Sequence, residues 1–209
     1  AAPNAGVDGA TTICDSSATP IDLNTLITSE QPGGTWTRST GSGGTLTPGG
    51  IYTPAPGALT STFTYTVNGL APCGNDTSEA RVNINAQPNA GVSGLAKVVC
   101  ENDNTAIDLF SLINGEQTGG TWVRSSGTGG VFDAATARYT PAAGATNSTF
   151  TYTIIGTPPC VDSSSLATID INAQPNAGVD GAVAICDSST TARSEERRVG
   201  KECTYECRS

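Results

Sequence analysis

The chain has 209 residues, a formal net charge of −9 and no histidine. Lack of histidine removes the commonest general base and the commonest metal ligand, and the acidic charge argues against nucleic acid or an anionic membrane as a partner. No apolar run approaches the ~20 residues of a membrane span. We therefore expect a protein that is no enzyme, binds no nucleic acid and does not insert into a membrane.

One repeated unit makes up most of the chain. The string Pro-Asn-Ala-Gly-Val occurs at Pro3–Val7, Pro88–Val92 and Pro175–Val179. Such a period indicates an array of one domain type. We predict a first repeat over residues 1–87, a second over 88–174 and the truncated start of a third over 175–191. The sequence begins on a repeat boundary without a signal peptide, so we expect a piece of a longer polypeptide.

The first repeat contains several short segments with strand signals. Ile21-Asp22-Leu23 fits either a strand or a single helical turn, and Trp36 follows a Gly-Gly turn, as the buried anchor of a strand start would. Gly41–Gly44 suits a β-turn, because neither a helix nor a Lys follows that would hold a phosphate. Ser61–Thr66 alternates Thr with aromatic residues, which predicts a strand with one buried face.

The second repeat follows the first almost without gaps. Trp122 takes the place of Trp36, and Ser148–Thr153 has the same six residues as Ser61–Thr66. The last strand of each repeat also alternates apolar and polar residues. Several short strands, turns, one Trp and two cysteines in under 90 residues predict an all-β fold, with an antiparallel immunoglobulin-like (Ig-like) β-sandwich in each repeat.

The joints between repeats are short. Asn85-Ala86-Gln87-Pro88 and Asn172-Ala173-Gln174-Pro175 leave few residues between the last strand of one domain and the first strand of the next. Proline stiffens such a joint. We therefore expect the tandem domains to be arranged as a semi-rigid rod, in which neighbouring repeats touch only at their ends.

Five of the seven cysteines recur in phase with the repeat: Cys14, Cys73, Cys100, Cys160 and Cys186. In-phase cysteines predict disulfides and an oxidising, extracellular compartment. Two pairings respect the period. One joins Cys14 to Cys73 and Cys100 to Cys160 and leaves Cys186 unpaired, whereas the other joins Cys73 to Cys100 and Cys160 to Cys186. We favour the first, because a disulfide that closes a loop of ~60 residues would stabilise a small core by about 4 kcal/mol.

No constellation predicts catalytic or cofactor-binding residues. Asn102-Asp103-Asn104 offers ligands of the calcium type, but Ser16-Ser17-Ala18 replaces it in the first repeat, so we assign no metal site. Residues 192–209 match neither repeat and resemble a read-through artefact found at the ends of predicted genes, so we expect them to be non-native. The alternative, a metal or dimerisation site at Cys203 and Cys207, has no other ligands beside it.

The repeated motifs Pro-Asn-Ala-Gly-Val-Asp, Ile-Asp-Leu, Gly-Gly-Thr-Trp, Tyr-Thr-Pro and Phe-Thr-Tyr-Thr resemble the tandem Ig-like or PKD-like repeats of Bacteroidota surface proteins. Those proteins are described as gliding-motility-associated or as cargo of type IX secretion. The resemblance implies secretion to the cell surface and no catalytic residues. It covers Pro3 to about Thr191.

We expect a non-enzymatic stalk segment of a large secreted cell-surface adhesin. Its partners would be the neighbouring repeats of the same polypeptide, other copies of itself or surface glycans. The alternatives are a homopolymeric extracellular filament completed by strand exchange and a carbohydrate-binding module.

Overall fold

The computed structural model describes residues 2–175, 177, 178, 180 and 181. Most of the predicted third repeat, with Cys186, and the tail at 192–209 lie outside the described residues. The chain divides into two compact units. Among the described residues, the first contains those up to Val92, Gly115–Thr121 and Tyr152–Ser165, and the second contains Ser93–Asn114, Trp122–Thr151 and those after Ser165. The predicted boundaries at 87/88 and 174/175 follow the sequence period instead and stay predictions.

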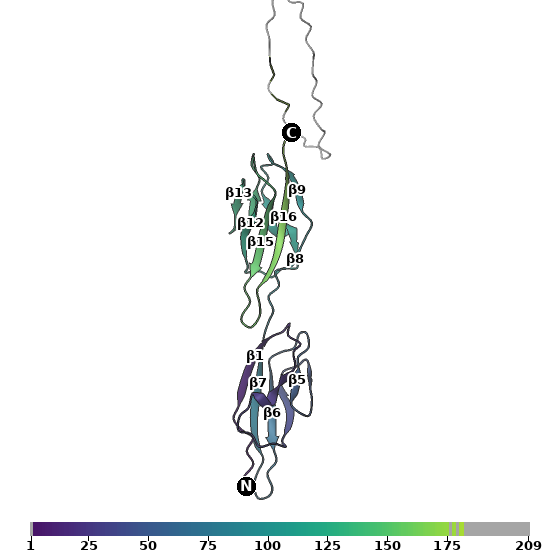
Figure 1. Cartoon of the computed structure of the whole chain (residues 1–209), viewed down its shortest axis with the longest axis vertical. Helices are drawn as coiled ribbons and strands as arrows, with labels where there is room; N and C mark the ends of the chain where they lie inside the picture. Colours follow the sequence, from purple (N-terminus) through teal and green to yellow (C-terminus); the bar gives the residue numbers. More distant parts are fainter. Residues whose placement is uncertain (1, 176, 179, 182–209) are drawn as a thin grey trace, which may run out of the picture. The chain divides into compact units, whose positions relative to one another are not determined.

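The strands of the first repeat lie in a four-stranded and a three-stranded sheet (Figure 1). The four-stranded sheet has the order β1 (Gly9–Cys14), β7 (Asp76–Asn85), β6 (Ser61–Val67) and β3 (Thr35–Thr40). The three-stranded sheet has the order β2 (Ile21–Asp22), β5 (Ile51–Thr53) and β4 (Thr45–Leu46). The 3-10 helix η1 (Leu23–Thr25) follows β2 directly, so the ambiguous segment is a strand and a helical turn in succession.

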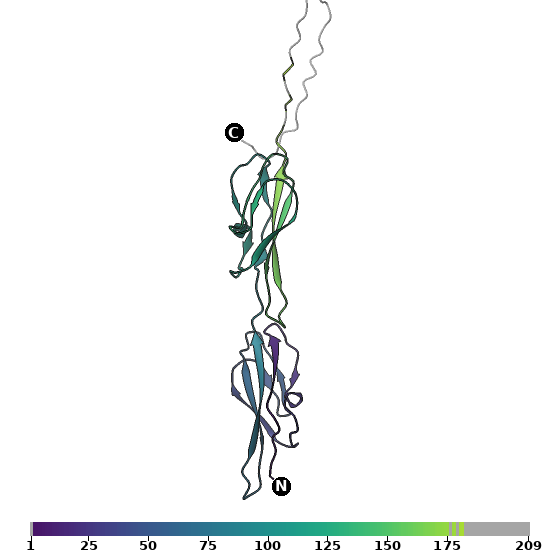
Figure 2. The ribbon, with the colours of Figure 1, turned by 90° about the vertical axis from the view of Figure 1, so that its left-hand side faces the viewer.

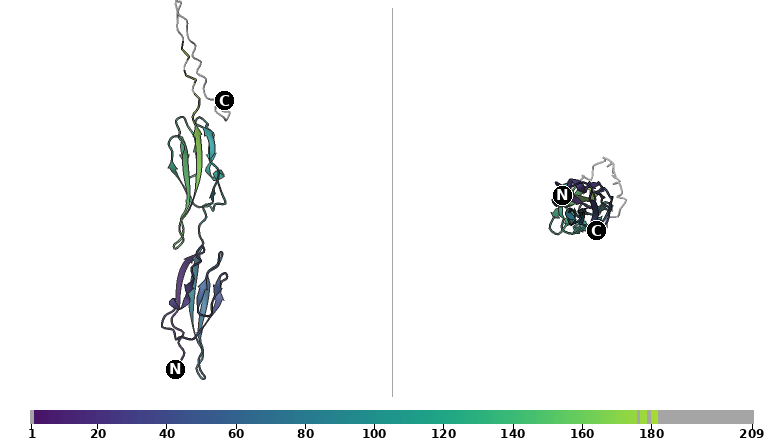
Figure 3. Two further views of the ribbon diagram at one scale, coloured as in Figure 1. Left: turned by 45° about the vertical axis from the view of Figure 1, so that its right-hand side comes forward. Right: turned by 90° about the horizontal axis from the view of Figure 1, so that it is seen from below.

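The second repeat forms the same two sheets from equivalent strands. The four-stranded sheet has the order β12 (Thr121–Ser126), β15 (Ser148–Ile154), β16 (Ser163–Asn172) and β9 (Lys97–Cys100). The three-stranded sheet has the order β10 (Ile107–Asp108), β14 (Arg138–Thr140) and β13 (Val131–Asp133), and η2 (Leu109–Leu112) follows β10. A small sheet pairs β11 (Ile113–Asn114) with β8 (Val92–Ser93). Figure 3 shows the long strand β16 in light green.

In each repeat, the strand that ends in a cysteine joins its sheet in parallel. β3, β6 and β7 pair antiparallel, as predicted. β1, in contrast, runs parallel to β7, with Cys14 opposite Asn85, and Figure 2 shows the two strands pointing in the same direction. β9 pairs with β16 in the same way and places Cys100 opposite Asn172. This cysteine therefore lies where the last strand of the repeat also ends.

The core of the first repeat lies between its two sheets. The predicted strand at Ser61–Thr66 is confirmed, because β6 alternates buried and partly buried residues and directs Phe63 and Tyr65 inward. Phe63 meets Tyr52 of the opposite sheet with ring centroids 4.7 Å apart. Trp36 is buried near the start of β3, as predicted. These contacts join the two sheets and confirm the Ig-like β-sandwich.

Candidate functional site

A disulfide joins the two sequence repeats. Cys14 at the end of β1 is bonded to Cys160, which lies in the loop between β15 and β16. Both residues belong to the first compact unit, and their Cα atoms are 4.9 Å apart, within the usual range for a disulfide. Cys73 is free and exposed, and Cys100 is also disulfide-bonded. Cys186 lies outside the described residues.

Both predicted pairings are therefore wrong, and the fold explains why. Cys14 lies beside Asn85 at the end of β7, whereas Cys73 precedes Asp76 at its start. β7 has ten residues, so these two ends lie roughly 30 Å apart at the rise of an extended strand. A disulfide requires Cα atoms within about 7 Å. The same geometry separates Cys100 from Cys160 along β16, so a disulfide within a repeat is excluded.

Hydrogen bonds surround the disulfide. The side-chain amide of Asn85 donates to the carbonyl of Pro158 at 2.8 Å, and that of Gln87 donates to the carbonyl of Val161 at 2.9 Å. Asp15 Oδ1 accepts the backbone N–H of Gln87 at 2.8 Å and so fixes the chain just before Pro88. The disulfide is thus one part of a junction that also uses polar side chains.

We call Cys14, Asp15, Asn85 and Gln87 the exit cluster of the first repeat. The second repeat has the same arrangement in Cys100, Glu101, Asn172 and Gln174, its exit cluster. The backbone N–H groups of Asp15 and Glu101 donate to the carbonyls of Asn85 and Asn172, each at 2.9 Å. Glu101 Oε1 accepts the N–H of Gln174 at 3.1 Å, as Asp15 does from Gln87.

Sequence reasoning missed the role of these polar residues. It treated Asn85-Ala86-Gln87 as a linker, although the same tripeptide recurs at 172–174 and an acidic residue follows Cys14 and Cys100 alike. Both are in-phase signals that point to a shared local structure. The parallel pairing of β1 with β7, which brings the cysteine and the linker together, leaves no comparable mark in the sequence.

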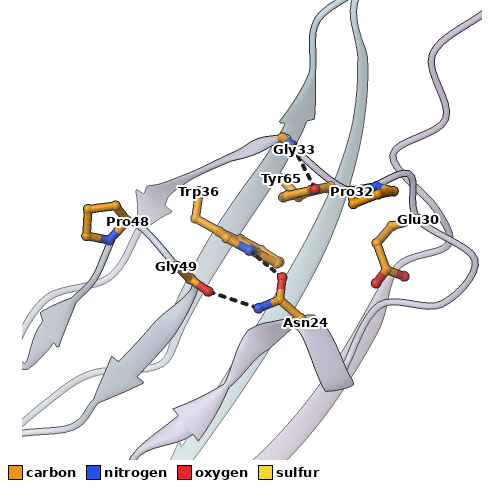
Figure 4. Close-up of a pocket in the computed structure, with 9 residues that line it drawn as sticks. Asn24, Glu30, Pro32, Gly33, Trp36, Pro48, Gly49 and Tyr65 are labelled. Atoms are coloured by element: carbon orange, nitrogen blue, oxygen red, sulfur yellow. Dashed lines mark hydrogen bonds between the residues drawn. The ribbon is translucent and has the colours of Figure 1, made fainter.

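Trp36 and Tyr65 of the first repeat border a pocket of about 240 Å³ (Figure 4). Trp36 Nε1 donates to Asn24 Oδ1 at 3.0 Å, and the Asn24 amide donates to the carbonyl of Gly49 at 2.9 Å. The Tyr65 hydroxyl accepts the N–H of Gly34 at 2.8 Å and donates to a backbone carbonyl. Trp36 is 7% exposed and Tyr65 4% exposed. Both rings are therefore used for the core and leave little aromatic face for stacking on a sugar.

The candidate calcium segment is used in local structure. Asp103 Oδ1 accepts the backbone N–H of Thr105 at 2.9 Å, and hydrogen bonds from Thr105 hold the Asp103 pKa below its usual value. The Asn102 amide donates to Gln174, away from this turn. Within residues 2–175 and the four described positions after them, no three His, Cys, Asp or Glu side chains group as metal ligands. No helix among the same residues is long and apolar enough to cross a membrane.

No protein-family model matches the chain, and no curated protein sequence matches it. Among solved structures, an E-to-A mutated three-Ig fragment of titin aligns with 78% of this chain and 62% of its own length, at 7% identity and a TM-score of 0.44. Mouse clustered PcdhgC3 EC1-3 aligns with 83% of this chain and 67% of its own, at 13% identity and a TM-score of 0.39.

A SusE-like surface-located polysaccharide-binding protein from the Bacteroides thetaiotaomicron heparin utilisation locus aligns with 81% of this chain and 34% of its own, at 15% identity and a TM-score of 0.30. The chain thus spans 62% of the titin fragment and about a third of the SusE-like protein. These neighbours include Ig-like domain repeats and a surface protein, and at such identities and TM-scores they assign no function to this chain.

Proposed function

We propose that the chain is a non-enzymatic stalk segment of a large secreted cell-surface adhesin, in which each joint between repeats is held by a disulfide. The observation that carries this proposal is the Cys14–Cys160 bond, which ties the exit cluster of one repeat to a loop of the next. A covalent cross-link between neighbouring repeats is not required for catalysis or ligand binding. It is useful in a stalk, because a stalk transmits force between its two ends.

Two further observations support the stalk. Ala86 and Gln87 alone separate the end of β7 from Pro88, so the joint is short as well as cross-linked. The chain is also acidic, and a disulfide of this kind persists in an oxidising compartment such as the cell exterior. A joint tied by two covalent connections, the backbone and the disulfide, has less freedom to bend than the backbone alone.

Small-angle X-ray scattering of the oxidised full chain tests the proposal. We expect the scattering of an elongated two-domain particle, and a broader distribution of interatomic distances for the Cys160→Ser variant, in which the joint can bend. The matched control is Cys73→Ser, which removes a cysteine that is free in this chain and should leave the scattering unchanged. A compact particle in the oxidised chain would refute the stalk.

The carbohydrate-binding alternative finds less support. It needs exposed aromatic rings, and the Trp and Tyr residues that recur in phase are buried in the cores of both repeats. Glycan-array binding that is lost when an exposed aromatic residue such as Phe110 is changed to Ala would revive it.

A further inference from the structure

The loop that carries the free Cys73 has the same structure as the loop that carries the bonded Cys160. We call residues 68–75 and 155–162 the Pro-Cys loops of repeats 1 and 2. In each, a cis peptide bond precedes the proline next to the cysteine. The cysteine N–H donates to the carbonyl three residues earlier, at 2.8 Å for Cys73 and 3.0 Å for Cys160.

Further contacts fix both loops in the same way. The N–H of Gly69 donates to Asn75 Oδ1 at 3.1 Å, and that of the equivalent Gly156 donates to Asp162 Oδ1 at 2.8 Å. A Cβ at either glycine would collide with backbone carbonyl oxygens on the far side of its loop. The loop conformation therefore does not depend on the disulfide, because the loop with the free cysteine adopts it too.

The two loops differ in what covers them. Cys160 is 6% exposed, because the exit cluster of repeat 1 contacts it. Cys73 is exposed, and the neighbouring Leu70 is 87% exposed. The Pro-Cys loop of repeat 1 thus has the conformation of the Pro-Cys loop of repeat 2, which is docked on an exit cluster. Within the residues that the structure describes, no exit cluster contacts the loop of repeat 1.

The contacts made by the docked loop are nearly independent of its side chains. Asn85 and Gln87 donate to the backbone carbonyls of Pro158 and Val161. Ala71 and Gly74 occupy the equivalent positions in the loop of repeat 1 and offer the same carbonyl groups. An exit cluster with Asn and Gln at the same positions would therefore find its acceptors there, although the two loops differ in sequence.

We infer that the Pro-Cys loop of repeat 1 is a docking site for the exit cluster of another copy of this repeat, to which Cys73 becomes disulfide-bonded. The partner would present a cysteine equivalent to Cys14, with an Asn and a Gln equivalent to Asn85 and Gln87. The exit cluster of repeat 2 shows that this set of groups recurs in the chain. The inference rests on the proposed function, since it extends the same cross-linked joint to a further repeat.

The bond would form by thiol–disulfide exchange with a small-molecule or protein disulfide. The thiolate of Cys73 attacks that disulfide, forms a mixed disulfide and releases one thiolate. The thiolate of the partner cysteine then attacks Cys73 Sγ and releases the second. Two protein thiols are oxidised to one disulfide, the reagent disulfide is reduced to two thiols, and the two protons end on the released sulfurs.

The test adds a repeat to the full chain. A copy of residues 1–87 with Cys73→Ser is fused before Ala1, so that its Cys14 faces the native Cys73. The protein is oxidised with a glutathione redox buffer and digested with trypsin without reduction. Cys73 lies on the peptide 39–81. Trypsin cuts the added copy after Arg81, so the native Cys14 lies on a longer peptide than the Cys14 of the added copy, and mass spectrometry distinguishes them.

We expect the Cys14 peptide of the added copy linked to the peptide 39–81, with loss of Cys73 alkylation by a maleimide under native conditions. The control carries Cys14→Ser in the added copy and should restore alkylation. Slow amide exchange in a peptide of the added copy that spans β6 and the Cys73→Ser substitution reports that this copy is folded. If it does not fold, a copy of residues 88–174 with Cys160→Ser replaces it, and Cys73 should then be linked to a Cys100 peptide.

The outcomes separate the inference from the proposed function. A free Cys73 in a folded three-repeat chain that retains the Cys14–Cys160 peptide overturns the inference and leaves the proposed joint intact. Absence of the Cys14–Cys160 peptide from the unmodified chain overturns the proposed joint itself. Cys73 linked between two separate molecules through a cysteine other than one of an exit cluster, detected as a dimer, also overturns the inference.

Discussion

The two repeats share their interiors and differ at their edges. Phe63 and Phe150 are fully buried at equivalent positions and contact Tyr52 and Tyr139 in the same way. The Pro-Cys loops also share one conformation, yet one cysteine is bonded and the other is free. Local structure is thus set by the repeated residues, whereas the covalent state of a loop depends on what lies next to it.

The largest expected effect tests whether the two interiors are equivalent. Phe63→Ala and Phe150→Ala each remove a fully buried ring, so each should lower the free energy of unfolding of its own repeat by about 3–5 kcal/mol. Hydrogen exchange followed by mass spectrometry measures this for each repeat separately. Losses that differ by more than about 2 kcal/mol would show that the cores are packed differently.

The second prediction concerns Cys73 and Cys160, which are equivalent in sequence although one is free and the other is disulfide-bonded. Cys160→Ser removes the disulfide between Cys14 and Cys160, two residues 146 positions apart. This change should lower the free energy of unfolding of the oxidised chain by about 2–5 kcal/mol. Cys73→Ser removes an exposed free thiol and should leave it nearly unchanged. Urea denaturation of both variants measures the difference. Equal losses would contradict the Cys14–Cys160 pairing.

The sandwich could be predicted because its signals are local. Ser-Thr-Phe-Thr-Tyr-Thr is long enough to show a period of two, and β6 and β15 bury their aromatic residues as that period requires. The parallel pairing of β1 with β7 was not predictable in this way. Parallel and antiparallel partners require the same alternation, and Gly9–Cys14 carries no further signal that selects between them.

The junction was the part that sequence reasoning predicted least well. The phase of the cysteines permits any pairing that repeats with the domain. The two predicted pairings lay within one repeat (Cys14 with Cys73, Cys100 with Cys160) or between repeats (Cys73 with Cys100, Cys160 with Cys186). Excluding them requires knowing that Cys14 and Cys73 lie at opposite ends of β7, which follows from the strand pairing and not from the spacing. An error in strand direction therefore became an error in disulfide assignment.

A smaller effect concerns the residue that contacts the buried Trp, which differs between the two repeats. In repeat 1, Trp36 Nε1 donates to Asn24. In repeat 2, Phe110 takes the place of Asn24 and packs edge-on against Trp122 with ring centroids 5.5 Å apart. Asn24→Ala leaves the Trp36 N–H without this acceptor and should destabilise repeat 1 by about 1–2 kcal/mol. Phe110→Ala removes an aromatic contact and should destabilise repeat 2 by about 0.5–1.5 kcal/mol, in addition to the loss from the apolar area that the ring no longer buries.

Fluorescence and urea titration distinguish these two effects. With Trp122→Phe as the background, Asn24→Ala should shift the emission of Trp36, because the hydrogen bond to the indole N–H is lost. Asn24→Asp keeps an acceptor oxygen for the Trp36 N–H but loses the amide donor to the Gly49 carbonyl and to Asp22 Oδ1, so it should recover the Trp36 emission and not the full stability. An emission of Trp36 that is unchanged in Asn24→Ala would contradict a contribution from this hydrogen bond.

The smallest predicted effect is a pH dependence confined to repeat 2. The side chain and backbone of Thr136 and the N–H of Ala135 donate to Asp133 and hold its pKa below the ordinary value, whereas Thr47 takes its place in repeat 1. A lowered pKa stabilises the folded state above the unfolded pKa of about 4, and this contribution is lost as the pH falls through the folded value. In an NMR titration, Thr136→Val should raise the Asp133 pKa and weaken the acid dependence of repeat 2, because the hydroxyl donor is removed while the backbone donors remain. An unchanged pKa in Thr136→Val would assign the shift to the backbone of the turn alone.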